Sequence, residues 1–293
     1  MHLAIVVNPT SGKRHGEKIS GQAAQRLTDA GHTTIIVQGA DAAAARDQLK
    51  LAIDGGLDGV LVVGGDGALH GVLDHVADSD LVFGLIPAGT GNDTARSLGI
   101  PVKDVDAAVD LVIAGNVRTI DLARADEAYV ATVVASGFDS KVNERANEMT
   151  WPRGNMRYNI AMVAELREFE PLPFTLVLDG KTIEREAMLV AVGNGPSFGG
   201  GLRICEGARM DDGLLDVVVI NPVSKPKLLR VFPKLYKGTH VTLPEFERHL
   251  VKEVTLTSPG IVAYGDGERL GPLPMTTRIQ PGALRVFAPP AGT

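Results

Sequence analysis

The stretch Val60-Leu61-Val62-Val63-Gly64-Gly65-Asp66-Gly67 decides the fold of the first half of the chain. Its four apolar residues, three of them β-branched, predict a strand buried on both faces, as in a parallel sheet. Three glycines around one aspartate then break the strand. A helix is predicted next from the spacing of Leu69, Val72, Leu73 and Val76. A strand, a glycine turn and a helix N-terminus together favour phosphate binding.

Asp66 is the unexpected member of this turn. A carboxylate repels a phosphate unless a metal ion or a proton lies between them. We therefore expect a nucleotide–metal site rather than simple anion capture, with Asp66 serving the metal and not the packing. The alternative is a tight turn in which Asp66 caps the following helix, and this turn alone does not decide between the two.

Composition limits the class of protein. The 293 residues allow two domains with separate cores, and the net charge of −6 argues against a nucleic-acid-binding protein. The single cysteine, Cys205, excludes an internal disulfide and a multi-cysteine zinc site, so we expect a reducing compartment. With no secretory pattern and no apolar run of about 18 residues, we expect a cytoplasmic protein that is not transmembrane.

Two further predicted strands also end in polar, glycine-rich turns. Leu3–Val7 leads into Asn8-Pro9-Thr10-Ser11-Gly12-Lys13, and Leu81–Ile86 leads into Pro87-Ala88-Gly89-Thr90-Gly91-Asn92-Asp93. Helical patterns separate the strands, so strands and helices alternate. The first half of the chain is therefore predicted to be a doubly wound parallel sheet with a site along one edge.

From Arg118 the pattern changes to short alternating strands. They are expected over Ala128–Ala135, Phe174–Leu178, Ala187–Gly193, Leu214–Ile220 and Glu253–Thr257. Hairpin turns are predicted at Asp179-Gly180 and Asp212-Gly213, and helices over Ala161–Glu168 and Lys225–Lys237. The expected fold is α/β: a doubly wound nucleotide domain over residues 1–120, with 283–293 as an optional addition, and a β-rich antiparallel sandwich over 121–282.

Taken together, these motifs resemble the diacylglycerol kinase catalytic family, most closely its soluble bacterial lipid kinases, which share their fold with sphingosine and ceramide kinases. The resemblance is carried by the three glycine-rich turns, by Asp121 after Arg118-Thr119-Ile120, and by Gly265-Asp266-Gly267-Glu268. Gly-Gly-Asp-Gly alone is shared with NAD kinases. Its combination with Gly-Thr-Gly-Asn-Asp and a late Asp-Gly-Glu is specific.

The resemblance implies that ATP binds the first domain and that the second supplies the acceptor side. The implied nucleotide contacts are Asn8, Pro9, Thr10, Ser11, Gly12, Gly64, Gly65, Asp66, Gly67, Ala68, Leu69, His70, Gly71, Gly89, Thr90 and Asn92. A carboxylate network of Asp66, Asp93 and Asp121 is implied to hold the catalytic Mg²⁺ through water. Asp266 and Glu268 lie in the motif that supplies the family's base. A structural Mg²⁺ is implied at Asp212, with Arg209 and Leu214.

The sequence departs from the family pattern after Asp66, where Ala68, His70 and Gly71 replace a threonine, an asparagine and a glutamate. The leading expectation is an ATP- and Mg²⁺-dependent kinase that converts diacylglycerol to phosphatidic acid. The alternatives are a kinase for another lipid alcohol (a sphingoid base or phosphatidylglycerol), an NAD kinase, and an inactive nucleotide- or lipid-binding homologue.

The expected partner is a lipid at the inner face of the membrane, and a homodimer is left open. Five basic residues lie on the predicted helical segment Lys225–Lys237. A solvated face is the default interpretation of such a segment, and attraction to anionic lipid headgroups is the alternative. The glycine loop Ser197–Leu202 is a candidate border of an acyl groove.

Overall fold

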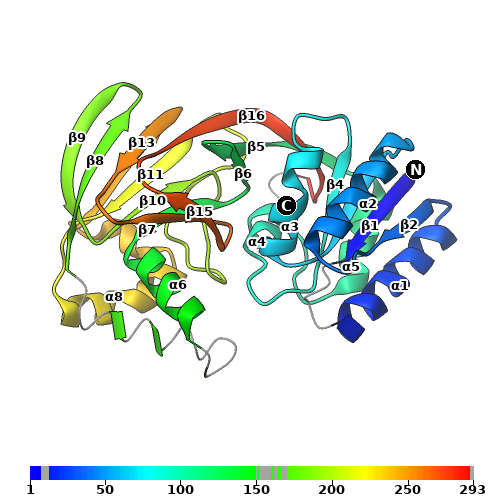
Figure 1. The fold of residues 1–293 in the computed structure, drawn as a ribbon, viewed down its shortest axis with the longest axis horizontal. Helices are drawn as coiled ribbons and strands as arrows, with labels where there is room; N and C mark the ends of the chain where they lie inside the picture. The colour runs from blue at the N-terminus through cyan, green and yellow to red at the C-terminus, as the bar shows by residue number, and fades with distance from the viewer. Residues whose placement is uncertain (8–12, 150, 152–159, 162–163, 166–169, 291–293) are drawn as a thin grey trace.

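A computed structural model describes residues 1–293 except 8–12, 150, 152–159, 162–163, 166–169 and 291–293. Figure 1 shows an α/β half that holds helices α1 to α5 and a β-rich half that holds α6 and α8. The long strand β16 (Met275–Phe287) runs from one half into the other. The expected turn at 8–12 lies outside the described residues.

The α/β half is a doubly wound sheet, as predicted. Four parallel strands pair in the order β2-β1-β3-β4: β1 (His2–Val7), β2 (Thr33–Val37), β3 (Gly59–Gly64) and β4 (Val82–Pro87). Five helices accompany them: α1 (Lys13–Asp29), α2 (Ala42–Asp54), α3 (Asp66–Val76), α4 (Asp93–Leu98) and α5 (Val105–Ala114). Apolar residues of α1 and α5 pack on one face of the sheet, and those of α2 and α3 pack on the other.

Strand β16 makes one sheet out of parts of both halves. Its C-terminal end pairs parallel to β4, and its N-terminal part pairs antiparallel to β13 (Glu253–Thr257). The ten-stranded sheet continues through β8 (Leu172–Leu178) and β9 (Lys181–Ala187), and β5 (Val117–Ala125) also pairs with β16. The expected boundary between residues 282 and 283 therefore falls inside a strand, and the division into two domains stays a prediction.

A second, antiparallel sheet completes the predicted sandwich. Its order is β12 (Phe246–Val251), β11 (Leu215–Ile220), β10 (Leu189–Gly193), β7 (Val133–Gly137), β14 (Val262–Gly265) and β15 (Glu268–Pro272). Side chains such as Phe174 and Val190 fill the space between the two sheets. The other face of this sheet packs against α8 (Lys225–Tyr236), while α6 (Phe138–Glu148) follows β7 directly.

One of the two predicted hairpin turns is wrong. Asp179-Gly180 does connect β8 to β9, with φ of +44° and +84°, a conformation that favours aspartate and glycine. Asp212-Gly213 instead precedes β11, which pairs only with β10 and β12, so it closes no hairpin. The strand predicted over 128–135 is also divided, into β6 (Ala128–Val130) and β7. Most of the helix predicted over 161–168 lies outside the described residues.

Candidate active site

A cavity of about 720 Å³ lies where the two halves of the protein meet. One end is polar and glycine-rich, lined by the turns after β3 and β4 and by the turn between β14 and β15. The other end is apolar, lined by residues of α6, α8 and the outer face of the antiparallel sheet. Such a cavity suits a ligand pair with one highly charged and one apolar member.

The glycines of the two turns pack too closely for any side chain. A Cβ on Gly89 would lie 2.6 Å from the Cα of Gly65, and a Cβ on Gly91 would lie 2.9 Å from Oδ2 of Asp66. Helix α3 begins at this point without a side-chain cap. Its N-terminus is therefore open to an anion, in the place where the sequence predicts phosphate binding.

Only some of the predicted nucleotide contacts line the cavity. Those that do are Gly65, Asp66, Gly67, Ala68, Gly89 and Thr90. Gly64 is buried in β3, and Leu69 packs in the core between α3 and the sheet, so neither residue faces the cavity. His70 and Gly71 lie further along α3, beyond the lining residues. These four residues do not line the cavity, and only the first turn of a helix presents its free amides to a ligand, so their nucleotide contacts stay predictions that the cavity does not support.

Asn92 shapes the turn rather than lining the cavity. It is buried, it has a φ of +55°, and its side-chain amide donates to the carbonyl of Gly89 and accepts from the amide of Gly89. An asparagine tolerates this left-handed conformation better than most residues do. It therefore holds the Gly89–Gly91 loop in position.

Asp66 has a structural role that the sequence analysis did not expect. Its carboxylate accepts hydrogen bonds from the backbone amides of Asp93 and Thr94, each at 3.1 Å. These amides belong to the first turn of α4, so Asp66 caps α4, not the helix in which it lies. The expectation that Asp66 does not serve the packing is thus wrong, because its carboxylate connects the two glycine turns. Its role at a metal ion stays a prediction.

Asp93 connects the α/β half to the loop before β11. Its carboxylate accepts from the amides of Gly200 (2.6 Å) and Gly201 (2.7 Å) and from the hydroxyl of Ser197 (3.1 Å). Burial raises the pKa of Asp93 and the nearby charge of Asp66 raises it further, while the hydrogen bonds oppose both. The sequence analysis named the 197–202 loop as a groove border but missed this contact.

Asp121 makes hydrogen bonds to other segments than Asp66 and Asp93 do. Its carboxylate accepts from the amides of Gly213 (2.7 Å) and Gly282 (2.8 Å), and it is not one of the cavity-lining residues. Among the described residues, no hydrogen bond joins it to either of the other two aspartates. The structure thus brings together two members of the predicted carboxylate network, and Asp121 instead holds the turn that contains Asp212.

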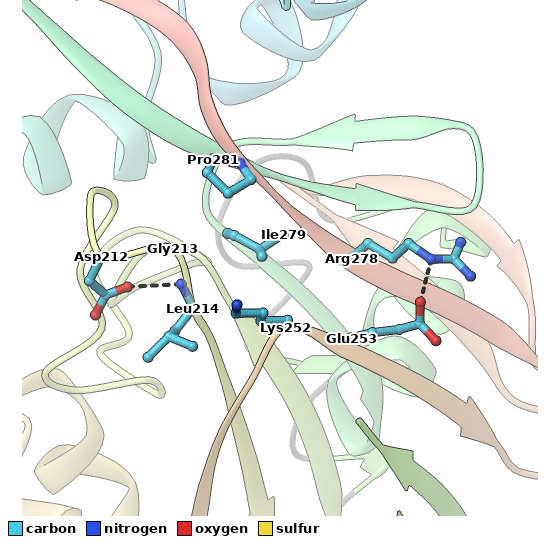
Figure 2. A pocket seen from close by; sticks show the side chains of 8 residues that line it. All are labelled: Asp212, Gly213, Leu214, Lys252, Glu253, Arg278, Ile279 and Pro281. Atoms are coloured by element: carbon cyan, nitrogen blue, oxygen red, sulfur yellow. Dashed lines mark hydrogen bonds and ion pairs between the residues drawn. The ribbon is translucent and has the colours of Figure 1, made fainter. Parts of the chain in front are cut away.

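A second cavity, of about 550 Å³, borders that turn. Figure 2 shows Asp212 at one end, where its Oδ1 accepts from the amide of Leu214 at 3.1 Å, and the Arg278–Glu253 pair at the other. Arg209 directs its guanidinium to Asp211 at 3.1 Å, which leaves only its backbone for the predicted metal. In the described part of the chain, no three His, Cys, Asp or Glu side chains group as metal ligands. The structural Mg²⁺ stays a prediction.

Two Asp212 variants separate the charge of this residue from its hydrogen bond. Asp212→Asn keeps an oxygen that accepts from Leu214 but removes the charge, whereas Asp212→Ala removes both. We expect Mg²⁺ to raise the melting temperature of the wild type and of neither variant, and Asp212→Ala alone to lose about 1 kcal/mol of stability without metal. Thermal unfolding with and without Mg²⁺ measures this, and equal Mg²⁺ shifts in all three proteins would rule out the metal.

Asp266 lies at the tip of the β14–β15 hairpin and lines the main cavity. Its carboxylate accepts from the amides of Ala131 (2.7 Å) and Thr132 (2.8 Å) and from the hydroxyl of Thr132 (2.5 Å). Burial raises the pKa of Asp266, and repulsion from Asp66 adds to this, although the three hydrogen bonds lower it. These bonds also explain why the strand predicted over 128–135 is interrupted at 131–132.

Glu268 reaches across the cavity to the other half. A Cβ on Gly67 would lie 2.6 Å from Oε1 of Glu268, so this carboxylate lies against the first turn of α3. Glu268 is exposed, unlike Asp266. The structure therefore brings Asp66, Asp93, Asp266 and Glu268 to one cavity, although they come from both halves of the chain.

Gly67→Ala tests whether this first turn must stay open. The added methyl would meet only the flexible end of Glu268, and alanine favours a helix, so we expect no loss of melting temperature. We expect kcat/KM for ATP to fall about ten-fold, because the methyl narrows the space beside the free amides. Gly71→Ala is the matched control, since a Cβ there has no neighbour within 4 Å, and its kinetics should be unchanged. Equal ATP kinetics in both variants would contradict the assignment.

Three buried polar residues make contacts in the site that the sequence analysis did not predict. Thr132 and Ser197 bond to Asp266 and Asp93, and Asn194 donates its side-chain amide to the carbonyls of Asp121 (2.9 Å) and Ala131 (2.8 Å). The asparagine thereby holds the segment that binds Asp266. Nothing in the local pattern distinguishes these residues from ordinary loop residues, because their partners are distant in sequence.

Family models match both halves of the chain. The model described as the diacylglycerol kinase catalytic domain matches residues 2–125, and the model described as a YegS C-terminal NAD kinase beta sandwich-like domain matches residues 132–288. The boundary between the matches falls in the short segment before β7.

Curated relatives match over almost the full chain. A diacylglycerol kinase of Mycobacterium tuberculosis (strain H37Rv) is 45% identical over 99% of this chain and 96% of its own. A diacylglycerol kinase of Bacillus subtilis (strain 168) is 28% identical over 84% of this chain and 81% of its own.

The fold has counterparts among solved structures. A putative diacylglycerol kinase from Bacillus anthracis (strain Sterne) superposes with a TM-score of 0.80 at 22% identity, covering 100% of this chain and 96% of the other. Within the described residues, no helix is long and apolar enough to cross a membrane.

Proposed function

This chain belongs to the diacylglycerol kinase family of lipid kinases, and from that premise we propose that it transfers the γ-phosphate of ATP to the hydroxyl of diacylglycerol, giving phosphatidic acid. The observation that carries the proposal is the continuity of the main cavity. A glycine-rich end suited to phosphates and an apolar end suited to acyl chains share one space, which Asp66, Asp93, Asp266 and Glu268 also line.

The polar end fits a nucleotide and Mg²⁺. The free amides at the start of α3 favour phosphate, and the glycine contacts leave room for its close approach. Asp66 and Asp93 repel each other. Both oxygens of Asp66 and Oδ2 of Asp93 accept one amide bond each, so each keeps a lone pair that could hold the metal directly or through water, whereas Oδ1 of Asp93 already accepts from both Gly201 and Ser197. When bound, Mg²⁺ would neutralise charge on the transferring phosphate.

Asp266 and Glu268 are the candidates for the base on the acceptor side. The attacking hydroxyl must lose its proton, and a carboxylate within hydrogen-bond reach can accept it. Asp266 is fixed by three hydrogen bonds and has a raised pKa, as expected of a positioned base. Glu268 lies closer to the start of α3, so it could receive the proton or orient the hydroxyl.

The apolar end favours a lipid acceptor over NAD. The wall is built from residues such as Phe138, Leu202, Val231 and Phe246. A dinucleotide offers only the flat faces of its two bases to such a wall, whereas acyl chains offer a continuous apolar surface. The same residues do not distinguish one lipid alcohol from another, because acyl chains contact any apolar wall. Diacylglycerol is favoured by the relatives, whose names specify that kinase.

The proposed function is tested with a panel of acceptors. Purified protein is incubated with Mg²⁺, γ-³²P-labelled ATP and, separately, diacylglycerol, a sphingoid base, phosphatidylglycerol and NAD. We expect label in the organic phase with diacylglycerol at the highest rate. Faster labelling of another lipid would show that this lipid, and not diacylglycerol, is the preferred substrate. Labelling of NAD alone, or of no acceptor, would refute the lipid kinase assignment.

A further inference from the structure

One face of α8 forms a wall of the main cavity. Its apolar residues recur at helical spacing: Leu228, Val231, Phe232 and Leu235. Tyr236 belongs to the same wall but is 48% exposed, so the cavity reaches the outer surface of the protein at the C-terminal end of α8. Figure 1 shows α8 beside α6, on the side of the β-rich half opposite β16.

A second face of α8 is cationic. Lys227, Arg230, Lys234 and Lys237 follow one another at intervals of three or four residues. Lys227 pairs with Glu245 at 2.5 Å. The other three side chains are exposed and make no ion pair with any residue that the structure describes. Their charge is therefore available to a partner.

The charge of this region opposes that of the whole chain. Residues 217–244 contain five Lys and Arg and no Asp or Glu, whereas the chain as a whole has a net charge of −6. Two exposed apolar side chains belong to the same region: Tyr236 in α8, and Val241 in the short 3-10 helix η1 (Thr239–Thr242), which contacts α8. A strip of cations beside an aromatic ring is the composition of a surface that binds an anionic lipid interface.

We propose that Arg230, Lys234, Lys237, Tyr236 and Val241 form a membrane-docking surface, here termed the α8 surface, that binds the headgroups of anionic phospholipids. The inference rests on the proposed function, since a lipid acceptor must leave a bilayer to enter the cavity. Docking at the α8 surface places the exposed edge of the cavity against that bilayer. Each of the three cations contributes about five-fold to binding at low salt.

The test is sedimentation with vesicles of phosphatidylcholine that contain about 30 mol% phosphatidylglycerol, an anionic lipid that gives the vesicle surface a negative potential. The test variant carries Arg230→Gln, Lys234→Gln and Lys237→Gln. The control variant carries Lys18→Gln, Arg46→Gln and Lys50→Gln, three exposed cations on α1 and α2 in the other half. Both variants change the net charge equally, and both should keep the wild-type melting temperature.

We expect the test variant to bind anionic vesicles about 100-fold more weakly than the wild type, and the control variant to stay within about three-fold. Wild-type binding should fall with salt and be absent on pure phosphatidylcholine. Wild-type protein that does not bind anionic vesicles, a test variant that binds as the wild type does, or an equal loss in both variants would overturn the proposal.

Turnover in neutral detergent micelles separates this proposal from the proposed function. The three cations do not line the cavity, so the test variant should phosphorylate micellar diacylglycerol within two-fold of the wild-type rate. A wild type that phosphorylates no lipid in micelles refutes the proposed function, and the vesicle result still decides the docking surface. A test variant that loses micellar turnover as severely as vesicle binding would contradict a role confined to docking.

Discussion

Asp66→Asn is expected to reduce phosphate transfer on the order of a thousand-fold while the protein stays folded. Asp66 lies at the start of α3, where phosphate binding is favoured, and next to Asp93, which it repels. An uncharged amide at this position cannot help to hold a metal ion. Its oxygen can still accept from one amide of α4, and the other amide is left without an acceptor at a cost of about 1–3 kcal/mol, so part of the structural role is kept.

Asp66→Ala provides the comparison. It removes the cap of α4 as well as the charge, which should cost about 1–2 kcal/mol of stability in addition to the loss of turnover. Turnover and melting temperature are measured for both variants. If Asp66→Asn transfers phosphate at the wild-type rate in Mg²⁺ buffer, then Asp66 acts only as a cap and the metal assignment is wrong.

Removing the base should collapse kcat and leave ATP binding nearly intact. Glu268→Gln is the cleaner variant, because Glu268 is exposed and its replacement breaks no buried hydrogen bond. Asp266→Asn places an amide against the N–H of Ala131, leaving a buried donor unpaired at a cost of about 1–3 kcal/mol. At least one of the two should lose kcat by about a hundred-fold or more. Calorimetric ATP titration beside turnover separates binding from transfer.

The pH profile of Thr132→Val distinguishes the two candidates. The Thr132 hydroxyl donates to Asp266 and stabilises its charged form, so its loss should raise the pKa of Asp266 further. A base must be deprotonated to act. As the pH is lowered, Thr132→Val should therefore lose its activity at a higher pH than the wild type does. An unchanged acid limb, together with a strong effect of Glu268→Gln, would identify Glu268 as the base. ATP affinity that falls in proportion to kcat in both base variants would refute the acceptor-side assignment.

The strands and turns of the α/β half could be predicted because their signals are local. The apolar run Val60–Val63 and the glycines after it specify a buried parallel strand and a tight turn without reference to the rest of the chain. Parallel strands share one carboxyl edge, so the approach of Asp66 to the turn that holds Asp93 follows from the topology.

The placement of Asp121 could not be predicted in this way. The sequence analysis placed Asp121 directly after Arg118-Thr119-Ile120, whereas in the structure it lies inside β5, which continues to Ala125. The partners of its carboxylate are the amides of Gly213 and Gly282, the latter at an irregularity in the pairing of β16 with β5. Neither contact leaves a trace in the local sequence. The length of β16 was hidden for a different, local reason, since Pro281 and Gly282 interrupt its strand pattern.

The most direct test of the central claim is the stoichiometry of the reaction. Wild-type protein is incubated with ATP, Mg²⁺ and diacylglycerol in neutral detergent micelles, and ADP and phosphatidic acid are quantified over time by mass spectrometry. The account predicts one phosphatidic acid for each ADP, and a loss of both products in Asp66→Asn. ADP release without a phosphorylated lipid, or equal product formation by Asp66→Asn, would contradict it.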